Sequence, residues 1–477
     1  MDLSATRTRR LVGILAAGAV LGLWTAATPA HAVPAPVVDD RALGPALEIS
    51  GLNGPPEKTE QRALCVEPFL SGEAPRDAPL SQRLLDLPAA WQFSRGAGQL
   101  VAVIDTGVSR HPRLQVRPGG DFVVAGGDGT EDCDGHGTLV AGLIAGRPSP
   151  EDGFSGVAPE AEILAIRQLS LQFEAADRRG RDEPGKVSSG GYGNVLTMAG
   201  AVVRAVDSGA TVINISEVSC TPAGYDSADG ALGAAVKYAA DRNVVVVAAA
   251  GNLDQSVCAE QNESGWSGVR TAVSPAWFTP HVLAVASTDP DGATSPFSIH
   301  GPWVGIAAPG RAIVSLDSKP GGVGLVNAQR GEQGVSTIDG TSFSAAYVSG
   351  LAALVRARFP ELSAAQVIER IQRTAHNPGT GRDDSVGYGL IDPVAALTAQ
   401  LPATAPHLQA DVPRMFPAPP IDPGPDPLPR RVATIGSLTL LALLGIGYLA
   451  SIPFRRRAAE TVDDEFGTQR SSAPEGR

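Results

Sequence analysis

The sequence predicts an α/β protein whose parallel β-sheet is covered by helices on both faces. Four runs rich in valine, isoleucine and alanine predict buried strands: "QLVAVIDTG", "AEILAIRQL", "ATVINIS" and "RNVVVVAAAGN". Three alanine-rich runs between them predict helices: "GTLVAGLIAG", "VLTMAGAVVRAVDSG" and "ALGAAVKYAADR". Near-continuous apolar strands joined by helices are typical of a parallel sheet that is buried on both sides.

The predicted domain occupies residues 81–400 of the 477-residue chain, and its neighbours differ from it in composition. Residues 33–80 are rich in proline and polar residues without a sustained periodicity, so we expect an extended arm. Residues 401–431 include "PAPPIDPGPDPLP", which favours a polyproline II stalk, although a ligand for SH3-type domains is an alternative. Residues 171–193 combine charge with glycine and predict an exposed loop inside the domain.

The first residues of the chain resemble an export signal. Arg7, Arg9 and Arg10 precede an uncharged apolar run, and "AHA" at residues 30–32 supplies the small side chains of an A-x-A cleavage site. We therefore expect a cleaved signal peptide over residues 1–32, with a retained signal anchor as the alternative.

A second apolar segment, residues 432–454, carries no charge over 23 positions. At a rise of about 1.5 Å per residue, a helix of this length spans roughly 34 Å, enough to cross a bilayer. Three arginines follow the segment, which favours a cytoplasmic tail over residues 455–477. Together with the export signal, the segment predicts a single-pass plasma-membrane protein whose folded domain lies on the extracytoplasmic side.

Charge and cysteine content narrow the function classes. The formal net charge is -12 and no segment of the exterior domain concentrates lysine and arginine, so we expect no nucleic-acid partner. Four cysteines in an exported chain suggest two disulfides, for which three pairings exist, and we favour Cys65 with Cys133 and Cys220 with Cys258. The sequence has neither a C-x-x-C spacing nor a calcium loop of the EF-hand type, so we expect no metal or other cofactor.

One serine stands at the predicted start of a small-residue helix, in "DGTSFSAAYVSG" at residues 339–350. Ser342 is either a nucleophile or a polar residue where two elements pack closely. A serine hydroxyl becomes a useful nucleophile when a histidine takes its proton and a carboxylate orients that histidine. His136, flanked by glycines in "EDCDGHGTLVAG", is the best candidate base. Asp105, at the end of the strand in "LVAVIDTGV", is the best candidate for the orienting carboxylate.

These candidates occur in the chain order Asp105, His136, Ser342, which is the order of the subtilisin triad. "VAVIDTGV", "DGHGTLVAG" and "DGTSFSAAYVSG" closely resemble the three signature segments of subtilisin-like serine proteases. The resemblance covers about residues 90–400 and implies a subtilisin-like fold and an endopeptidase that acts through an acyl-enzyme. "VVVVAAAGN" resembles the subtilase segment whose asparagine donates to the oxyanion, which implies that role for Asn252. The backbone N–H of Ser342 would be the second donor.

One segment departs from the subtilase pattern. Where subtilases usually carry Ser-Leu-Gly-Gly along the primary specificity pocket, this chain has Ser216, Glu217 and Val218 in "ISEVSC". The resemblance implies that these three residues bind substrate. A side chain in place of a glycine would narrow this edge of the cleft, so we expect selective processing rather than broad digestion.

The layout of the whole chain resembles the mycosins, the membrane-anchored subtilases of actinobacterial type VII secretion systems. The matching features are the arm with "EKTEQRALCVEP", the four cysteines, the proline-rich stalk and the single C-terminal apolar segment. The resemblance implies that the protease processes secreted proteins as part of a type VII secretion membrane complex. A structural component that stabilises this machinery, with dispensable proteolysis, is the alternative. A plain exported degradative subtilase is a third interpretation, which the predicted membrane span opposes.

The arm at residues 33–80 has two candidate roles. Secreted subtilases usually carry an N-terminal chaperone and inhibitor that is cleaved away, and such a removable propeptide is one of them. A bond from Cys65 to Cys133 would keep the arm attached even after a cut. We therefore expect a permanent extension that wraps around the catalytic domain.

Overall fold

The computed structural model describes residues 34–177, 191–254, 257–331, 334–401, 433 and 435–450. The chain divides into two units, Met1–Ala405 and Pro406–Arg477. The predicted signal peptide, residues 402–431 of the predicted stalk and the predicted tail at 455–477 lie outside the described residues.

A seven-stranded sheet forms the centre of the first unit. Its strands lie in the order β11-β10-β8-β6-β2-β4-β3, and every neighbouring pair is parallel. The strand bounds are β2 Leu100–Asp105, β3 Val116–Asp121, β4 Glu162–Arg167, β6 Val212–Ile215, β8 Val245–Ala249, β10 Val282–Thr288 and β11 Val304–Pro309. β2, β4, β6 and β8 fall within the four apolar runs that predict the sheet, so the predicted parallel sheet is confirmed.

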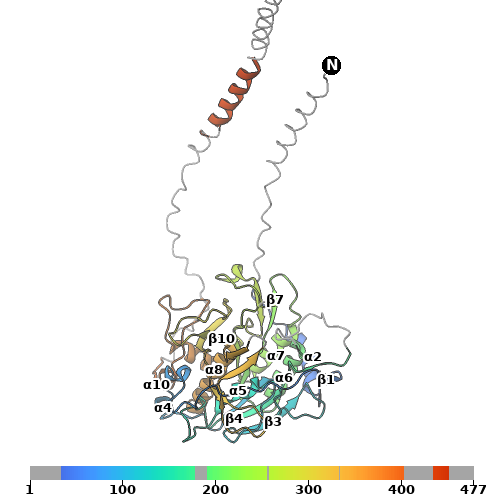
Figure 1. Cartoon of the computed structure of the whole chain (residues 1–477), viewed down its shortest axis with the longest axis vertical. Helices are drawn as coiled ribbons and strands as arrows, with labels where there is room; N and C mark the ends of the chain where they lie inside the picture. Colours follow the sequence, from blue (N-terminus) through green and yellow to red (C-terminus); the bar gives the residue numbers. More distant parts are fainter. Residues whose placement is uncertain are drawn as a thin grey trace, which may run out of the picture. The chain divides into compact units, whose positions relative to one another are not determined.

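Helices cover both faces of this sheet, as the sequence predicts. The longer helices are α5 His136–Ala145, α6 Val195–Asp207, α7 Gly230–Asp241, α8 Thr341–Arg358 and α9 Ala364–Arg373, and the short helix α10 spans Pro393–Thr398. β2, β6, β8, β10 and β11 are buried at every position, so neither face is open to solvent along these strands. α5 packs against α8 and α6 packs against α7, and the two pairs enclose the sheet (Figure 1).

The N-terminal arm is not extended throughout, in contrast to the expectation for residues 33–80. It starts with the short helices η1 (Asp40–Leu43) and α2 (Gly44–Ser50). α2 packs closely on α6 because Gly200 has no side chain: a β-carbon there would lie 2.3 Å from Cγ2 of Ile49. A seven-residue helix that begins with Gly-Pro is too short to show a helical periodicity, which is why the sequence pattern missed it.

The rest of the arm is tied to the domain at several points. β1 (Thr59–Gln61) pairs antiparallel with β5 (Phe173–Ala175), which lies in the predicted loop at 171–193. A disulfide joins Cys65 to Cys133. The arm is therefore joined to the domain by strand pairing and by a covalent bond.

Several short elements complete the unit. They are α3 Leu80–Arg83, α4 Leu87–Ala90, η2 Trp266–Gly268, β7 Ser219–Pro222, β9 Thr271–Ser274, β12 Ser315–Leu316, β13 Leu325–Val326, β14 Ala328–Gly331 and β15 Gly334–Thr337. β7 pairs with β9, β12 with β13, and β14 with β15, each antiparallel. β3 was not predicted because Pro118, Gly119 and Gly120 are typical of turns; it is an edge strand with an irregular register at this point, where such residues are tolerated.

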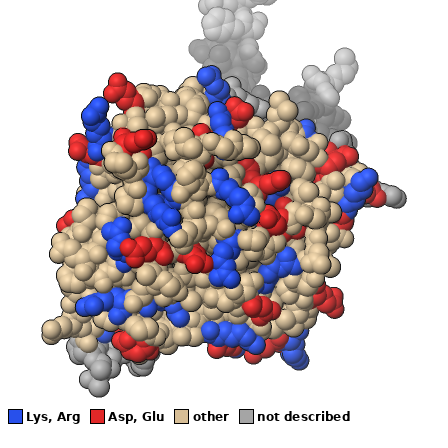
Figure 2. Space-filling model, turned by 90° about the horizontal axis from the view of Figure 1, so that it is seen from below, with Lys and Arg blue, Asp and Glu red and all other residues tan. Residues whose placement is uncertain are grey.

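One face of the protein carries both signs of charge (Figure 2). On the face seen in Figure 2, acidic and basic side chains lie close to one another across most of the visible area. Opposite charges that are interspersed in this way compensate one another locally, so this face presents no extended field of one sign.

In the second unit, residue 433 and residues 435–450 are helical and exposed. Among the residues that the structure describes, no helix is both long and apolar enough to cross a membrane. Residues 432, 434 and 451–454 of the predicted span lie outside that part of the chain.

Candidate active site

Asp105 is the last residue of β2 and is fully buried. The carboxyl ends of parallel strands are where open α/β sheets form their sites. The Oδ1 atom of Asp105 accepts a hydrogen bond from the backbone N–H of Thr106 at 2.8 Å and lies 2.7 Å from Nδ1 of His136. A carboxylate in this position keeps the proton on Nδ1 and leaves Nε2 of His136 as the proton acceptor.

His136 is the first residue of α5, and the glycines around it allow strand, loop and helix to approach closely. Gly135 has a φ of 80°, a conformation that favours glycine. A β-carbon at Gly137 would lie 2.1 Å from the carbonyl oxygen of Gly107. The side chain of His136 keeps 24% of its surface exposed, so a substrate can reach it from the cleft.

Asp132 is a partly buried carboxylate that no sequence motif marks. It accepts hydrogen bonds from the N–H and hydroxyl of Thr138, from the N–H of Gly135 and from the hydroxyl of Thr106. The Thr106 hydroxyl in turn accepts from the N–H of Gly137 at 3.0 Å. Burial raises the pKa of Asp132 to about 6. This network holds the first turn of α5 against the end of β2. In the sequence, nothing distinguishes Asp132 from an ordinary turn residue.

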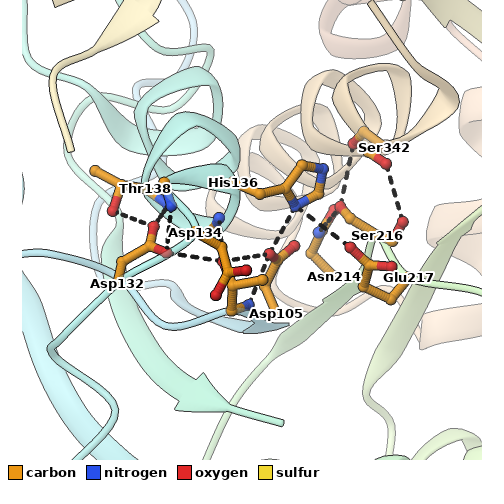
Figure 3. Close-up of polar contacts among 12 residues, drawn as sticks. Asp105, Asp132, Asp134, His136, Thr138, Asn214, Ser216, Glu217 and Ser342 are labelled. Atoms are coloured by element: carbon orange, nitrogen blue, oxygen red, sulfur yellow. Dashed lines mark hydrogen bonds and ion pairs between the residues drawn. The ribbon is translucent and has the colours of Figure 1, made fainter. Parts of the chain in front are cut away.

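Ser342 is the second residue of α8 and is 7% exposed. Its Oγ donates a hydrogen bond to the carbonyl of Ser216 at 3.0 Å, and Oγ of Ser216 donates to the carbonyl of Ser342 at 3.1 Å. Figure 3 shows the serine hydroxyl directed to Ser216. Without substrate, catalytic hydrogen bonds between a nucleophile and its base are often long or poorly aligned, and they tighten only when substrate binds.

Asn252 is fastened to the start of α8. Its Oδ1 accepts from the N–H of Thr341 at 3.0 Å and from the Thr341 hydroxyl at 2.9 Å, which leaves the side-chain NH₂ as a donor. The first N–H groups of a helix have no intrahelical partner, so the N–H of Ser342 is a second donor at the same place. A carbonyl oxygen that enters this corner would therefore meet donors of the kind that stabilise an oxyanion.

Most of the predicted site residues line one cleft of about 310 Å³, whereas Asp105 is fully buried behind His136 and does not line it. His136, Ser342 and Asn252 line it, and so does the predicted substrate-binding segment Ser216, Glu217 and Val218. The side chain of Val218 is almost fully buried, and a β-carbon at Gly251 would lie 3.7 Å from it, so the cleft is closely packed at this edge.

Two further lining residues come from distant parts of the chain. Pro68 belongs to the arm, and Gln329 belongs to β14. The two segments meet because Phe69 pairs with Ala328 in an isolated β-bridge. No sequence signal could have placed them at the cleft, because only the folded arm brings them together.

Glu217 brings a second carboxylate to the candidate base. Its Oε1 lies 3.6 Å from Nδ1 of His136, and one ligand atom each of Asp105, His136 and Glu217 lies within 4.8 Å of the others. Burial lowers the pKa of His136, but the charge and hydrogen bond of Asp105, with the charges of Glu217 and Asp132, outweigh this effect and raise it above the ordinary value. Only the neutral imidazole acts as a base, so this arrangement favours activity on the alkaline side of the ordinary histidine pKa.

Two disulfides flank the cleft, in the pairing that we favour from the sequence. Cys65–Cys133 joins the arm to the loop that precedes His136. Cys220–Cys258 joins β7 to the segment that follows Asn252, and Cys258 itself lines the cleft. Each bond fixes a segment that carries a candidate site residue.

Comparisons with known proteins agree with this geometry. A family model described as the subtilase family matches residues 96–389. The chain belongs to the subtilase family. The predicted subtilisin-like serine protease is thereby confirmed, while the individual roles of the site residues remain predictions.

The subtilase is similar to mycosins over nearly its full length. It is 45% identical to Mycosin-1 of Mycobacterium tuberculosis over 453 residues, which cover 92% of this chain and 98% of the relative. It is 44% identical to Mycosin-3 of the same organism over 461 residues, which cover 93% and 97%. The resemblance to mycosins that the sequence layout implied is confirmed by these matches.

Solved structures show the same likeness. A crystal structure of MycP1 from Mycobacterium smegmatis aligns with a TM-score of 0.71 at 45% identity, covering 78% of this chain and 96% of that chain. A chain in the structure of an intact ESX-5 inner membrane complex aligns with a TM-score of 0.72 at 42% identity, covering 88% and 100%.

Proposed function

We propose that this subtilase is a membrane-anchored serine endopeptidase that processes a small set of secreted proteins as part of a type VII secretion membrane complex. The observation that carries the proteolytic activity is the 2.7 Å contact of the buried Asp105 with His136, which lines the same cleft as Ser342. The secretion role is supported by similarity to "MycP1, an essential component of the type VII (ESX-1) secretion system", at 46% identity, and to the ESX-5 chain.

The geometry supports acyl transfer to Ser342. Its Oγ attacks the scissile carbonyl carbon while Nε2 of His136 takes the hydroxyl proton, and Asp105 stabilises the imidazolium that forms. Asn252 and the N–H of Ser342 donate to the oxyanion. His136 then protonates the leaving amine, which departs and leaves an ester on Ser342. A water molecule loses a proton to His136 and attacks this ester, and His136 then returns the proton to Oγ of Ser342 as the carboxylic acid product leaves.

The proposed location rests on the ends of the chain. The charge-free segment at 432–454 supports a single membrane span, and the export signal at 1–32 supports an extracytoplasmic domain. The ESX-5 periplasmic assembly, whose matching chain is 44% identical, supports the same side.

We also propose that the arm is a permanent part of the enzyme. Besides the bond from Cys65 to Cys133, the guanidinium of Arg204 on α6 donates to the carbonyls of Ser50 and Leu52. A removable propeptide would have to give up these contacts, and the disulfide would hold it after a cut.

A strain that carries only Ser342→Ala tests the function. We expect cleavage products of secreted proteins to vanish, because no acyl-enzyme can form, while the total amount secreted is kept. Mass spectrometry of the culture medium measures both quantities. Unchanged processing would contradict the proposed nucleophile.

The second candidate function is a structural part of the secretion machinery, which the match to a chain of a membrane complex favours. It predicts that deletion of the whole chain stops secretion, whereas Ser342→Ala changes neither secretion nor processing. Comparing the deletion strain with the Ser342→Ala strain separates the two functions.

A further inference from the structure

The cleft is lined by charged groups of one sign. Four carboxylates line it, and none of the described lining residues is a lysine or an arginine. The acidic residues are Asp134, Glu217, Asp254 and Asp339. On the face in Figure 2, by contrast, the two signs are interspersed. A narrow cleft lined by one sign of charge concentrates the field and attracts groups of the opposite sign.

Three of these carboxylates are committed to the structure of the cleft walls. Asp134 accepts hydrogen bonds from the hydroxyl of Ser170 and the N–H of Leu171. The other two behave similarly. Asp254 accepts from the N–H of Cys258, and Asp339 accepts from the N–H of Ala312 and lies 3.7 Å from the guanidinium of Arg311.

Glu217 occupies a different position, directly beside the reacting groups. It follows Ser216, whose carbonyl receives the hydroxyl of Ser342, and its own carboxylate lies 3.6 Å from Nδ1 of His136 (Figure 3). The side chain is 14% exposed toward the cleft that it lines. Glu217 is thus the cleft carboxylate that contacts the candidate base.

A bound peptide must pass close to this carboxylate. For its scissile carbonyl to lie at Ser342 and Asn252, the chain has to run over His136 and along Ser216 and Glu217. An ammonium or guanidinium group on a residue next to the scissile bond then comes within ion-pair distance of Glu217. Such a pair, partly shielded from water, contributes more than an exposed surface pair.

We propose that Glu217 is a specificity-determining residue that selects substrates with a lysine or arginine within two residues of the scissile bond, on its amino side. This inference rests on the proposed function, because it needs peptide bonds to be cleaved by Ser342. It names the substrate class of that site as a basic peptide segment.

Matched fluorogenic peptides test the proposal with the purified full-length enzyme. Two peptides differ only at one position before the scissile bond, where one has lysine and the other norleucine, which has the same carbon chain without the charge. The ratio of the two kcat/KM values isolates the charge, because both peptides meet the same His136. Mass spectrometry establishes that both are cut at the same bond. We expect wild type to prefer lysine by about tenfold, which corresponds to 1.4 kcal/mol at 25 °C.

Three variants sharpen this experiment. Glu217→Gln is expected to reduce the preference to less than about twofold, and Glu217→Lys to favour a glutamate peptide over its glutamine counterpart. Asp254→Asn removes one charge from the same cleft and is the matched control, for which the ratio is expected to stay within about twofold of wild type.

The outcomes are distinct. Cleavage without a preference for lysine, or a preference that survives in Glu217→Gln, overturns the inference and leaves the proposed function intact. Loss of the preference in Glu217→Gln, with retention in Asp254→Asn, supports it. If no peptide is cleaved in a Ser342-dependent manner, the proposed function fails and the inference fails with it.

Discussion

The two walls of the cleft are held in different ways. The wall built by β2 and α5 carries Asp105 and His136 and is fixed by the buried hydrogen bonds of Thr106 and Asp132. The opposite wall carries Glu217 and Asn252 on segments that leave the sheet, and the Cys220–Cys258 bond joins those two segments. The core of the fold therefore positions the base, whereas a disulfide holds the edge of the cleft where substrate binds and the carboxylate of Glu217 gives that edge its charge.

Asp105→Asn, on the wall that carries the base, should reduce catalytic activity more than any other substitution considered below. An asparagine cannot hold the proton on Nδ1 of His136 or stabilise its charged form, so we expect kcat to fall by about 10⁴-fold. Steady-state kinetics with a peptide substrate measure this, and an unchanged melting temperature is the control for folding. A fall of less than tenfold would show that Asp105 does not orient the base.

Asn252→Ala tests the proposed oxyanion donor on the opposite wall of the cleft. Loss of one oxyanion donor should lower kcat by about 10²- to 10³-fold with little change in KM, because the donor acts on charge that develops in the transition state. An increase in KM at unchanged kcat would instead assign Asn252 to ground-state binding.

Glu217→Gln tests the contact between Glu217 and His136 through the pH dependence of activity. Because Glu217 helps to raise the pKa of His136, its removal should lower that pKa and supply neutral imidazole at lower pH. We expect the acid limb of the kcat/KM profile to move down by about one pH unit, a tenfold gain on that limb. A limb that stays in place in Glu217→Gln, or moves equally in Asp254→Asn, would contradict the contact.

Thr106→Val examines how much the buried network of the first wall contributes. The hydroxyl of Thr106 donates to Asp132 and accepts from the N–H of Gly137. Its loss should lower kcat by about fivefold, the equivalent of one hydrogen bond of about 1 kcal/mol. The free energy of unfolding should fall by about 1–3 kcal/mol, because a buried N–H loses its acceptor. Denaturant titration measures the free energy of unfolding. If Thr106→Val has the same kcat as wild type, the hydrogen-bond network contributes to stability but not to catalysis.

Replacing both Cys220 and Cys258 by serine should affect kcat least, by about twofold or less, because neither residue touches the reacting groups. The free energy of unfolding should fall by about 4 kcal/mol on the loop-entropy estimate for a separation of 38 residues. Thermal unfolding and kinetics of the double variant measure the two effects. A large loss of kcat at full stability would mean that the bond positions Asn252 directly.

A site residue could be predicted when the residues next to it in the sequence form a recognisable pattern. Asp105, His136 and Ser342 each stand in a short segment whose neighbours are dictated by close packing, such as the glycine at 137 that meets a backbone carbonyl. The contact between Glu217 and His136 had no such signal, because it depends on how the strand ends of β2 and β6 lie beside each other in the sheet.

The same distinction applies to the fold. β2, β4, β6 and β8 carry continuous apolar runs and were predicted, whereas the equally buried β10 and β11 were not among the predicted strands and the edge strand β3 has a composition that indicates a turn. The start of the arm was expected to be extended, but α2 forms there because it packs on a glycine of α6, a tertiary effect that no local pattern shows.

The helix that presents Ser342 is also the central helix of the core. α8 is buried from its first residue to Val355 and contacts β6, β8, β10 and β11. A segment so deeply packed exchanges its amide hydrogens only when the whole domain opens. We therefore expect heat to destroy catalysis and structure in one cooperative event.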